Sequence, residues 1–165
     1  MPVSSERFRE IFGSLPTAVA VVTAIDENGS PRGFTCNAFC AVSAEPPLLM
    51  ISVGKASNTL PALQTSRAFV VNFLSSEGVD ASQIFAGKGQ DKFTRTRWEP
   101  SAVAEGAPVL TEVALAYAEC RTEQTVEAGD HLLIIGRVDG GTVFARDPLL
   151  YRKGSYHFLP QPAAL

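Results

Sequence analysis

Residues 33–53 combine side-chain types that suit a flat ligand with polar edges. The stretch reads GFTCNAFCAVSAEPPLLMISV, in which Thr35, Cys36 and Asn37 stand close together and Pro46-Pro47 precedes an apolar run. Short polar side chains let a ligand approach the backbone, whose N–H groups are strong hydrogen-bond donors. From the residues alone, a strand whose hydroxyl groups are satisfied by neighbouring groups explains the pattern better, and both alternatives stay open.

A second polar cluster precedes a short helix that we predict over residues 60–66. The cluster contains one cation and three short polar side chains, at Lys55, Ser57, Asn58 and Thr59. Hydroxyl groups, a cation and the free N–H groups of a helix start form an anion site when they occur together. Ordinary N-capping is the alternative, and it needs only one of these residues.

The three cysteines, Cys36, Cys40 and Cys120, form no even-numbered disulfide framework. The spacing of the first two is compatible with metal binding, but a zinc site needs about four ligands, and His131 and His157 lie far away in the sequence. We therefore expect no metal, and we interpret the cysteines as reduced and mostly buried small residues.

The elements that would position these residues are mostly strands. Apolar residues at helical spacing predict one short helix after Ser4 or Ser5, and in addition to the helix over 60–66 a third is predicted over residues 78–85. The Asn28-Gly29 and Gly129-Asp130 turns predict two hairpins. Strands are predicted over residues 18–25, 33–37, 39–43, 48–53, 69–74, 113–126, 131–138, 148–151 and 156–158. The run 48–53 is expected to be buried on both faces.

Antiparallel hairpins with few helices predict a mainly β barrel or sandwich. The sequence shows neither a βαβ rhythm nor a GxGxxG motif, which argues against a Rossmann sheet. We expect a single domain over residues 1–160 and a flexible tail over residues 161–165.

Composition excludes several classes of partner. The chain of 165 residues has a net charge of −3 and no basic block, so we expect no nucleic acid partner. No apolar run approaches the length of a membrane span, and no secretory signal is visible, which predicts a cytoplasmic protein. A hydrophobic fraction of 45% favours an oligomer.

Several segments, taken in order, give the chain a family resemblance. It resembles the short flavin reductases, which are FMN-binding split-barrel proteins that act as reductase components of two-component flavin-dependent monooxygenases. The matching segments cover nearly the whole chain and read GFTCNAFCAVSAEPPLLMISV, KASNT, FVVNFL, IFAGKGQDKF, GAPVL, AECRTEQTVEAGDH, IIGRV and PLLYRKGSYH. The resemblance implies an antiparallel Greek-key split β-barrel with a few short helices. It also implies a homodimer that uses NADH or NADPH to reduce FMN or FAD, and a separate monooxygenase that receives the reduced flavin.

The resemblance also implies roles for particular residues. The histidine of the Gly-Asp-His motif, His131, would be the catalytic residue beside the nicotinamide, and Tyr156 would flank the same pocket. The flavin would be bound by Thr35, Cys36, Asn37, Ala38, Ser52, Val53, Gly54, Lys55, Ser57, Asn58, Thr59, Phe85, Ala86, Gly87 and Lys92. Hydride transfer between two stacked rings needs alignment more than an acid or a nucleophile, which agrees with the lack of a catalytic triad.

Two other functions stay open from the sequence. One is a non-catalytic split-barrel protein that carries or senses flavin, and the other is a flavoenzyme that retains FMN and reduces its own substrate. The Gly129-Asp130-His131 motif favours the reductase, because a carrier needs no nicotinamide pocket. The sequence does not determine whether the flavin is FMN or FAD, or whether the hydride donor is NADH or NADPH.

Overall fold

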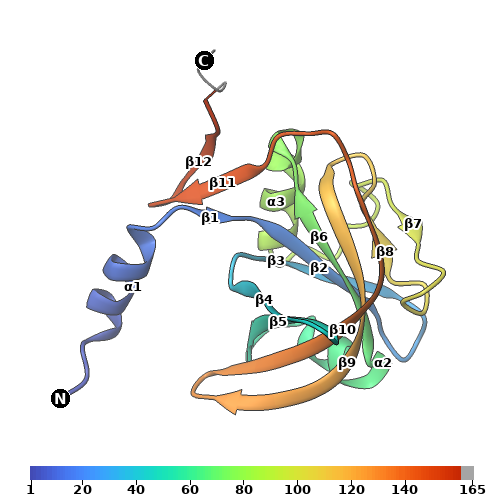
Figure 1. The fold of residues 1–165 in the computed structure, drawn as a ribbon, viewed down its shortest axis with the longest axis horizontal. Helices are drawn as coiled ribbons and strands as arrows, with labels where there is room; N and C mark the ends of the chain where they lie inside the picture. Colours follow the sequence, from blue (N-terminus) through green and yellow to red (C-terminus); the bar gives the residue numbers. More distant parts are fainter. Residues whose placement is uncertain (161–165) are drawn as a thin grey trace.

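The computed structural model describes residues 1–160, and the predicted tail at 161–165 lies outside the described residues. The chain begins with helix α1 (Ser5–Gly13), which is capped by Ser4, whose hydroxyl oxygen accepts a hydrogen bond from the Arg7 N–H at 3.1 Å. This helix stands away from the body of the molecule, and none of its residues is buried (Figure 1).

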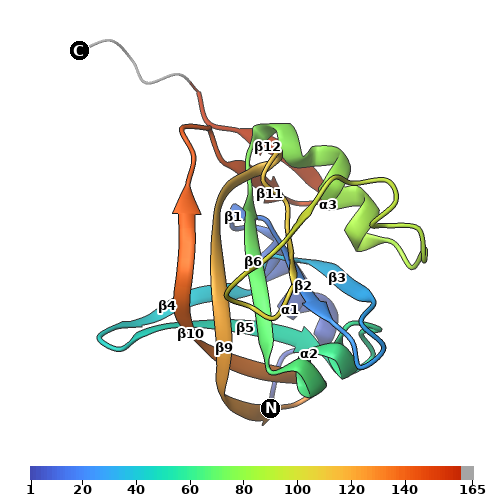
Figure 2. The same ribbon diagram turned by 90° about the vertical axis from the view of Figure 1, so that its right-hand side faces the viewer.

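A seven-stranded antiparallel sheet forms the body of the molecule, in the order β3-β2-β6-β9-β10-β5-β4. Its strands are β2 (Ala20–Ile25), β3 (Pro31–Cys36), β4 (Phe39–Ala44), β5 (Pro47–Gly54), β6 (Ala68–Leu74), β9 (Ala114–Ala128) and β10 (His131–Val143). The two edge strands, β3 and β4, are consecutive in the chain and are joined only by Asn37 and Ala38. The sheet must therefore curl until its edges approach, and Figures 1 and 2 show the resulting split barrel.

Short elements complete the fold. Helix α2 (Leu60–Ser66) precedes β6, and a 3-10 turn, η1 (Ser76–Gly78), leads into α3 (Val79–Ala86). A small sheet pairs β11 (Leu149–Arg152) with β1 (Thr17–Ala18) and β12 (Ser155–Phe158), and β7 (Glu99–Pro100) pairs with β8 (Pro108–Val109). The mainly β, antiparallel split barrel predicted from the sequence is thus confirmed.

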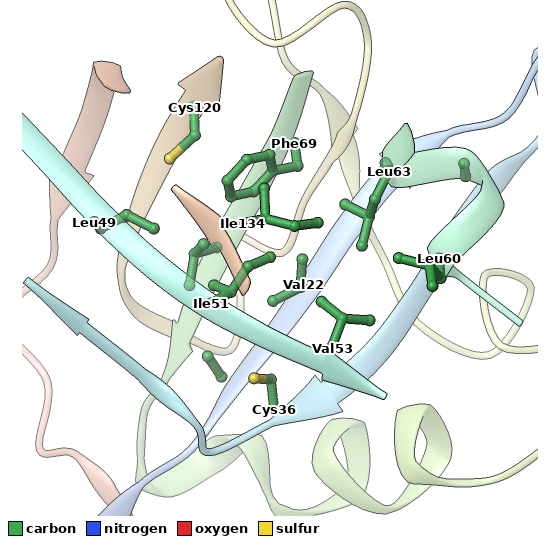
Figure 3. Packing of buried hydrophobic residues seen from close by; sticks show 14 of the residues in the cluster. Val22, Cys36, Leu49, Ile51, Val53, Leu60, Leu63, Phe69, Cys120 and Ile134 are labelled. Carbon is green, nitrogen blue, oxygen red and sulfur yellow. The ribbon is translucent and has the colours of Figure 1, made fainter. Parts of the chain in front are cut away.

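The main core fills the barrel. Figure 3 shows Phe69, Ile51 and Ile134 packed at its centre, with Val53 and Cys36 beside them. A second cluster, which includes Phe85 and Leu110, lies between the sheet and α3. Burial of such large side chains contributes about 1.5–3 kcal/mol each, so the two clusters hold the sheet and α3 in a fixed relation.

A buried amide ties the irregular segment before β9 to the sheet. Asn72 is fully buried, and its Nδ2 donates to the carbonyl oxygens of Val21 at 3.2 Å and Pro108 at 3.3 Å. Its Oδ1 accepts a hydrogen bond from the Leu110 N–H at 2.8 Å. Because every polar atom of the side chain has a partner, the buried amide carries little desolvation penalty.

Three local predictions differ from the structure. The run 18–25 divides at Val19 into β1 and β2, which belong to different sheets. Strand β5 was expected to be buried on both faces but alternates between buried and half-buried residues. Its half-buried face carries the apolar residues Leu48 and Met50, so the alternation is not visible in the sequence. Strand β4 is mostly exposed because it forms an edge of the sheet, so Cys40 is exposed while the other two cysteines are buried; all three are free.

No helix within residues 1–160 has the length and apolar character needed to span a bilayer. In the same range, no three His, Cys, Asp or Glu side chains gather in a way that would hold a metal ion.

Candidate functional site

The linker between the two edge strands leaves backbone donors exposed. Asn37 and Ala38 lie outside every strand, and within residues 1–160 their N–H groups donate to no protein acceptor. The linker is held from its other atoms, because Ala38 O accepts from the Ser52 N–H at 2.9 Å and Asn37 Nδ2 donates to Thr17 Oγ1 at 3.2 Å. Two free N–H groups on a fixed linker are suited to bind the polar edge of a ligand.

Thr35 connects this linker to α3 and to the small sheet. Its hydroxyl group donates to the Ser82 carbonyl oxygen at 2.6 Å. The Ser82 hydroxyl group lies 2.8 Å from Tyr156 Oη. The predicted residues Thr35 and Tyr156 are therefore brought together through Ser82, a residue that the sequence did not single out.

Two of the predicted residues belong to the main core of the barrel. Cys36 is 4% exposed and Val53 is fully buried, so each can offer a ligand only its backbone. Burial raises the pKa of the Cys36 thiol to about 11. The thiol is therefore neutral at pH 7 and is no activated nucleophile.

A surface pocket collects the second predicted cluster. Asn58 and Thr59, at the start of α2, line it together with Lys92 and with Gly33 of β3. The remaining lining comes from the start of β3 and from the loop after α3, at Pro31, Arg32, Lys88, Gly89, Gln90 and Phe93. We call this the cationic pocket, because three cations line it and no carboxylate does. Its charge and polar groups suit a phosphate.

Lys92 fastens the loop after α3 to the barrel. Its Nζ donates to the carbonyl oxygens of Gly33 at 3.2 Å and of Phe85 at 3.1 Å. Desolvation lowers the pKa of Lys92. Phe85 is buried and packs its ring edge-on against Phe93 at 5.0 Å, so it supports the pocket from behind rather than facing a ligand.

Other predicted residues lie beside the cationic pocket without lining it. Lys55 Nζ is paired with the Glu127 carboxylate at 3.1 Å, and both side chains are exposed. Ser57 Oγ accepts a hydrogen bond from the Thr59 N–H at 3.3 Å, so Ser57 has a local capping role. Gly87 follows the last residue of α3, Ala86, and lines a neighbouring pocket.

His131 is the first residue of β10. It pairs in register with Gly54, and the Lys55 N–H donates to the Asp130 carbonyl oxygen at 2.9 Å. Its Nδ1 lies 2.8 Å from Asp130 Oδ1, and this hydrogen bond lowers the pKa of the Asp130 carboxyl group. No hydrogen bond within residues 1–160 connects His131 with Tyr156.

The sequence reasoning missed part of the cationic pocket. Arg32 and Gln90 come from segments that are 58 positions apart, and Arg32 Nη1 donates to Gln90 Oε1 at 3.3 Å. Arg32 also forms an ion pair with Asp26 at 2.9 Å, which orients its side chain. Lys88 lies inside the segment IFAGKGQDKF, so its charge could have marked it as a phosphate ligand. Nothing in the sequence marks Arg32, because only the fold brings it close to the loop.

The chain matches the model of the family described as "Flavin reductase like domain" over residues 12–160. It is 41% identical to a flavin reductase (NADH) of Kitasatospora aureofaciens, with 93% of this chain and 81% of the relative covered. It is 36% identical to the reductase subunit of a flavin-dependent monooxygenase from Rhodococcus jostii, with 93% and 77% covered. Some relatives are longer, and the chain spans 49% and 47% of two of them.

A solved structure shows the same fold over nearly its whole length. An NADH:FAD oxidoreductase of Streptomyces globisporus, in complex with NAD and FAD fragments, is 31% identical and superposes with a TM-score of 0.90. The match covers 99% of each chain.

Proposed function

This chain belongs to the flavin reductase-like family, and we propose that it is an NAD(P)H:flavin oxidoreductase that supplies reduced flavin to a separate monooxygenase. One observation supports a flavin most directly. Strand β3 lines the cationic pocket at Gly33 and leads directly into the linker with two free N–H groups, which begins about four residues further along. That separation is roughly 13 Å along a strand, which suits a flavin that has a polar ring edge at one end and a phosphate at the other.

In this proposal, residues along and beside β3 bind different parts of the flavin. Asn37 and Ala38 bind the polar edge of the ring, where negative charge accumulates on reduction. Ser52 and Gly54 border the ribityl chain. Lys92 and the start of α2 bind the phosphate in the cationic pocket.

The nicotinamide side of the site is assigned to His131 and Tyr156. A nicotinamide nucleotide and a flavin bound together here would supply direct hydride transfer from the reduced nicotinamide to the flavin ring. The protein then has to align the two rings, and effective alignment alone lowers a barrier substantially. The Asp130 carboxylate orients His131 through Nδ1, so Nε2 is left to face a ligand.

We also propose that the protein works as a homodimer in the cytoplasm. Helix α1 and the segment after it expose four apolar side chains, and a second copy of the chain would bury them. These are Phe8, Ile11, Phe12 and Leu15. Three free cysteine thiols agree with a reducing compartment. The reductase subunits among its relatives support a monooxygenase as the recipient of the reduced flavin.

The decisive test is NADH and NADPH oxidation with added FMN and added FAD, in all four combinations. We expect turnover that depends on added flavin, followed by absorbance at 340 nm. Protein that is colourless after purification and active with added flavin would support a released flavin. Tight flavin binding without turnover in any combination would contradict the reductase and favour a carrier, whereas yellow protein that needs no added flavin would favour a flavoenzyme that retains FMN.

A further inference from the structure

A second surface pocket adjoins the cationic pocket across Gly89, which lines both. One wall is the exposed side of α3, with Asp80, Gln83 and Ile84 at helical spacing. The other wall is the loop after α3, which extends away from the barrel in Figure 2 and contributes Asp91 and Arg95 in addition to its two glycines. We call this the α3 pocket.

The two pockets differ in charge. Cations line the cationic pocket, while Asp80 and Asp91 face the α3 pocket. Arg95 Nη1 lies 3.8 Å from Asp91 Oδ2, so one of the two carboxylates is partly balanced. A second phosphate group would meet two carboxylates here and is disfavoured.

The side chains of the α3 pocket match the parts of a nucleoside. Carboxylates accept hydrogen bonds from the adjacent hydroxyl groups of a ribose, as acidic residues do in dinucleotide sites. The amide of Gln83 can both donate to and accept from a base edge. Ile84 offers apolar surface, and the planar guanidinium of Arg95 can stack on a flat base.

Building on the proposed function, we propose that the α3 pocket binds the adenosine half of FAD, so that FAD occupies both pockets and crosses Gly89. FMN ends at its phosphate and would reach the cationic pocket but not the α3 pocket. The preferred flavin is then FAD, and the basis of the preference lies on α3. A ligand continuous with the flavin phosphate reaches the α3 pocket directly, which favours the adenosine of FAD over that of NADH.

The glycine between the pockets suits this crossing. A Cβ atom at Gly89 would lie 2.7 Å from Asp91 Oδ1, so a side chain there would displace a carboxylate of the α3 pocket. Lys88, the neighbouring residue, is exposed and carries a charge that can follow a pyrophosphate.

The test compares the two flavins in binding experiments on the intact protein. The double variant Asp80→Ala/Gln83→Ala removes the polar groups of α3 that face the pocket, and alanine preserves the helix. Because these contacts are exposed and screened, we expect the Kd for FAD to rise about five- to tenfold. The Kd for FMN should change less than about twofold, since FMN does not reach α3. Glu27→Ala, in the exposed β2–β3 turn, is the matched control and should change neither.

Equal weakening of both flavins, or no change in either, would overturn the assignment. A raised KM for NADH with an unchanged Kd for FAD would place the adenosine of NADH in the α3 pocket and would also overturn it. In a second measurement, AMP should compete with FAD for the wild-type protein and compete less well in the double variant. These outcomes are separate from the proposed function, which fails if the wild-type protein oxidises neither nicotinamide nucleotide with either flavin.

Discussion

At the scale of single residues, the site depends more on backbone groups than on reactive side chains. The conspicuous Cys36 has its thiol in the core, and the free donors beside it are the N–H groups of Asn37 and Ala38. The cluster of small polar residues predicts that this segment faces a ligand, and this stays a prediction. The sequence could not predict which residues offer only backbone, since that depends on which way each side chain points from a curled strand.

Cys36→Ala is expected to keep most of the flavin-dependent NADH oxidation. The thiol is neutral and buried in the core, so its removal leaves a small cavity that costs about 1 kcal/mol of stability. Steady-state rates for the variant and the wild-type protein provide the comparison. A variant that still binds flavin but no longer reduces it would show that the thiol takes part in the chemistry.

The raised thiol pKa values also predict a pH effect. Burial raises the pKa of Cys36 to about 11 and that of Cys120 to about 12, above the ordinary value of 9.0. Between pH 9 and 11 the unfolded chain loses the Cys36 proton while the folded chain retains it, so the free energy of unfolding falls as pH rises. Denaturant titrations should show a shallower fall for Cys36→Ala. Iodoacetamide at pH 8 should modify the exposed Cys40 first.

At the scale of elements, local signals predicted most strands and helices but not their exposure. Turn residues and apolar runs were sufficient for the β2–β3 hairpin, α2 and β6. The positions of β4 at an edge and of Arg32 in the cationic pocket follow from the order of strands in the sheet, which joins residues far apart in the chain. No local pattern contains that information.

The contact between β3 and α3 gives a prediction at this scale. A Cβ atom at Gly33 would lie 2.9 Å from Phe85 Cε1 and 3.1 Å from the Val22 carbonyl oxygen, and the buried Phe85 ring has no space to retreat. Gly33→Ala should therefore lower the free energy of unfolding by about 1–3 kcal/mol. Gly13→Ala is the control, because no atom lies within 4 Å of a Cβ there, and it should change stability by less than about 0.5 kcal/mol. Equal melting temperatures for the two variants would contradict tight packing of α3 on β3.

At the scale of the whole molecule, the composition indicated surplus apolar residues, and the structure shows where part of the surplus lies. Phe8 and Phe12 stack at 4.6 Å on a helix that buries none of its residues. The helix is joined to the small sheet at its C-terminal end, where the Lys153 N–H donates to Gly13 O at 3.2 Å and Arg152 Nε donates to Ser14 O at 2.8 Å. We therefore propose that this amphipathic helix, which the small sheet holds at one end, is the surface that a second copy covers.

Light scattering should give a mass twice that of the 17.6 kDa chain. Phe8→Ser/Phe12→Ser should shift the protein toward monomer, because it removes the largest apolar side chains of the exposed face. Arg9→Ser, on the same helix, should not. A monomeric wild-type protein, or a double variant that remains fully dimeric, would contradict the role given to α1.

The linker between β3 and β4 has a further consequence for how the molecule can be divided. These strands pair with β2 and β5 and not with each other, so a break between Asn37 and Ala38 severs no strand pair. Fragments 1–37 and 38–165 would be joined by the β2–β6 and β1–β11 ladders. The position is thus suited to fragment complementation. Reassembly of the two fragments would restore the linker, and flavin reduction would then report that the fragments had bound each other.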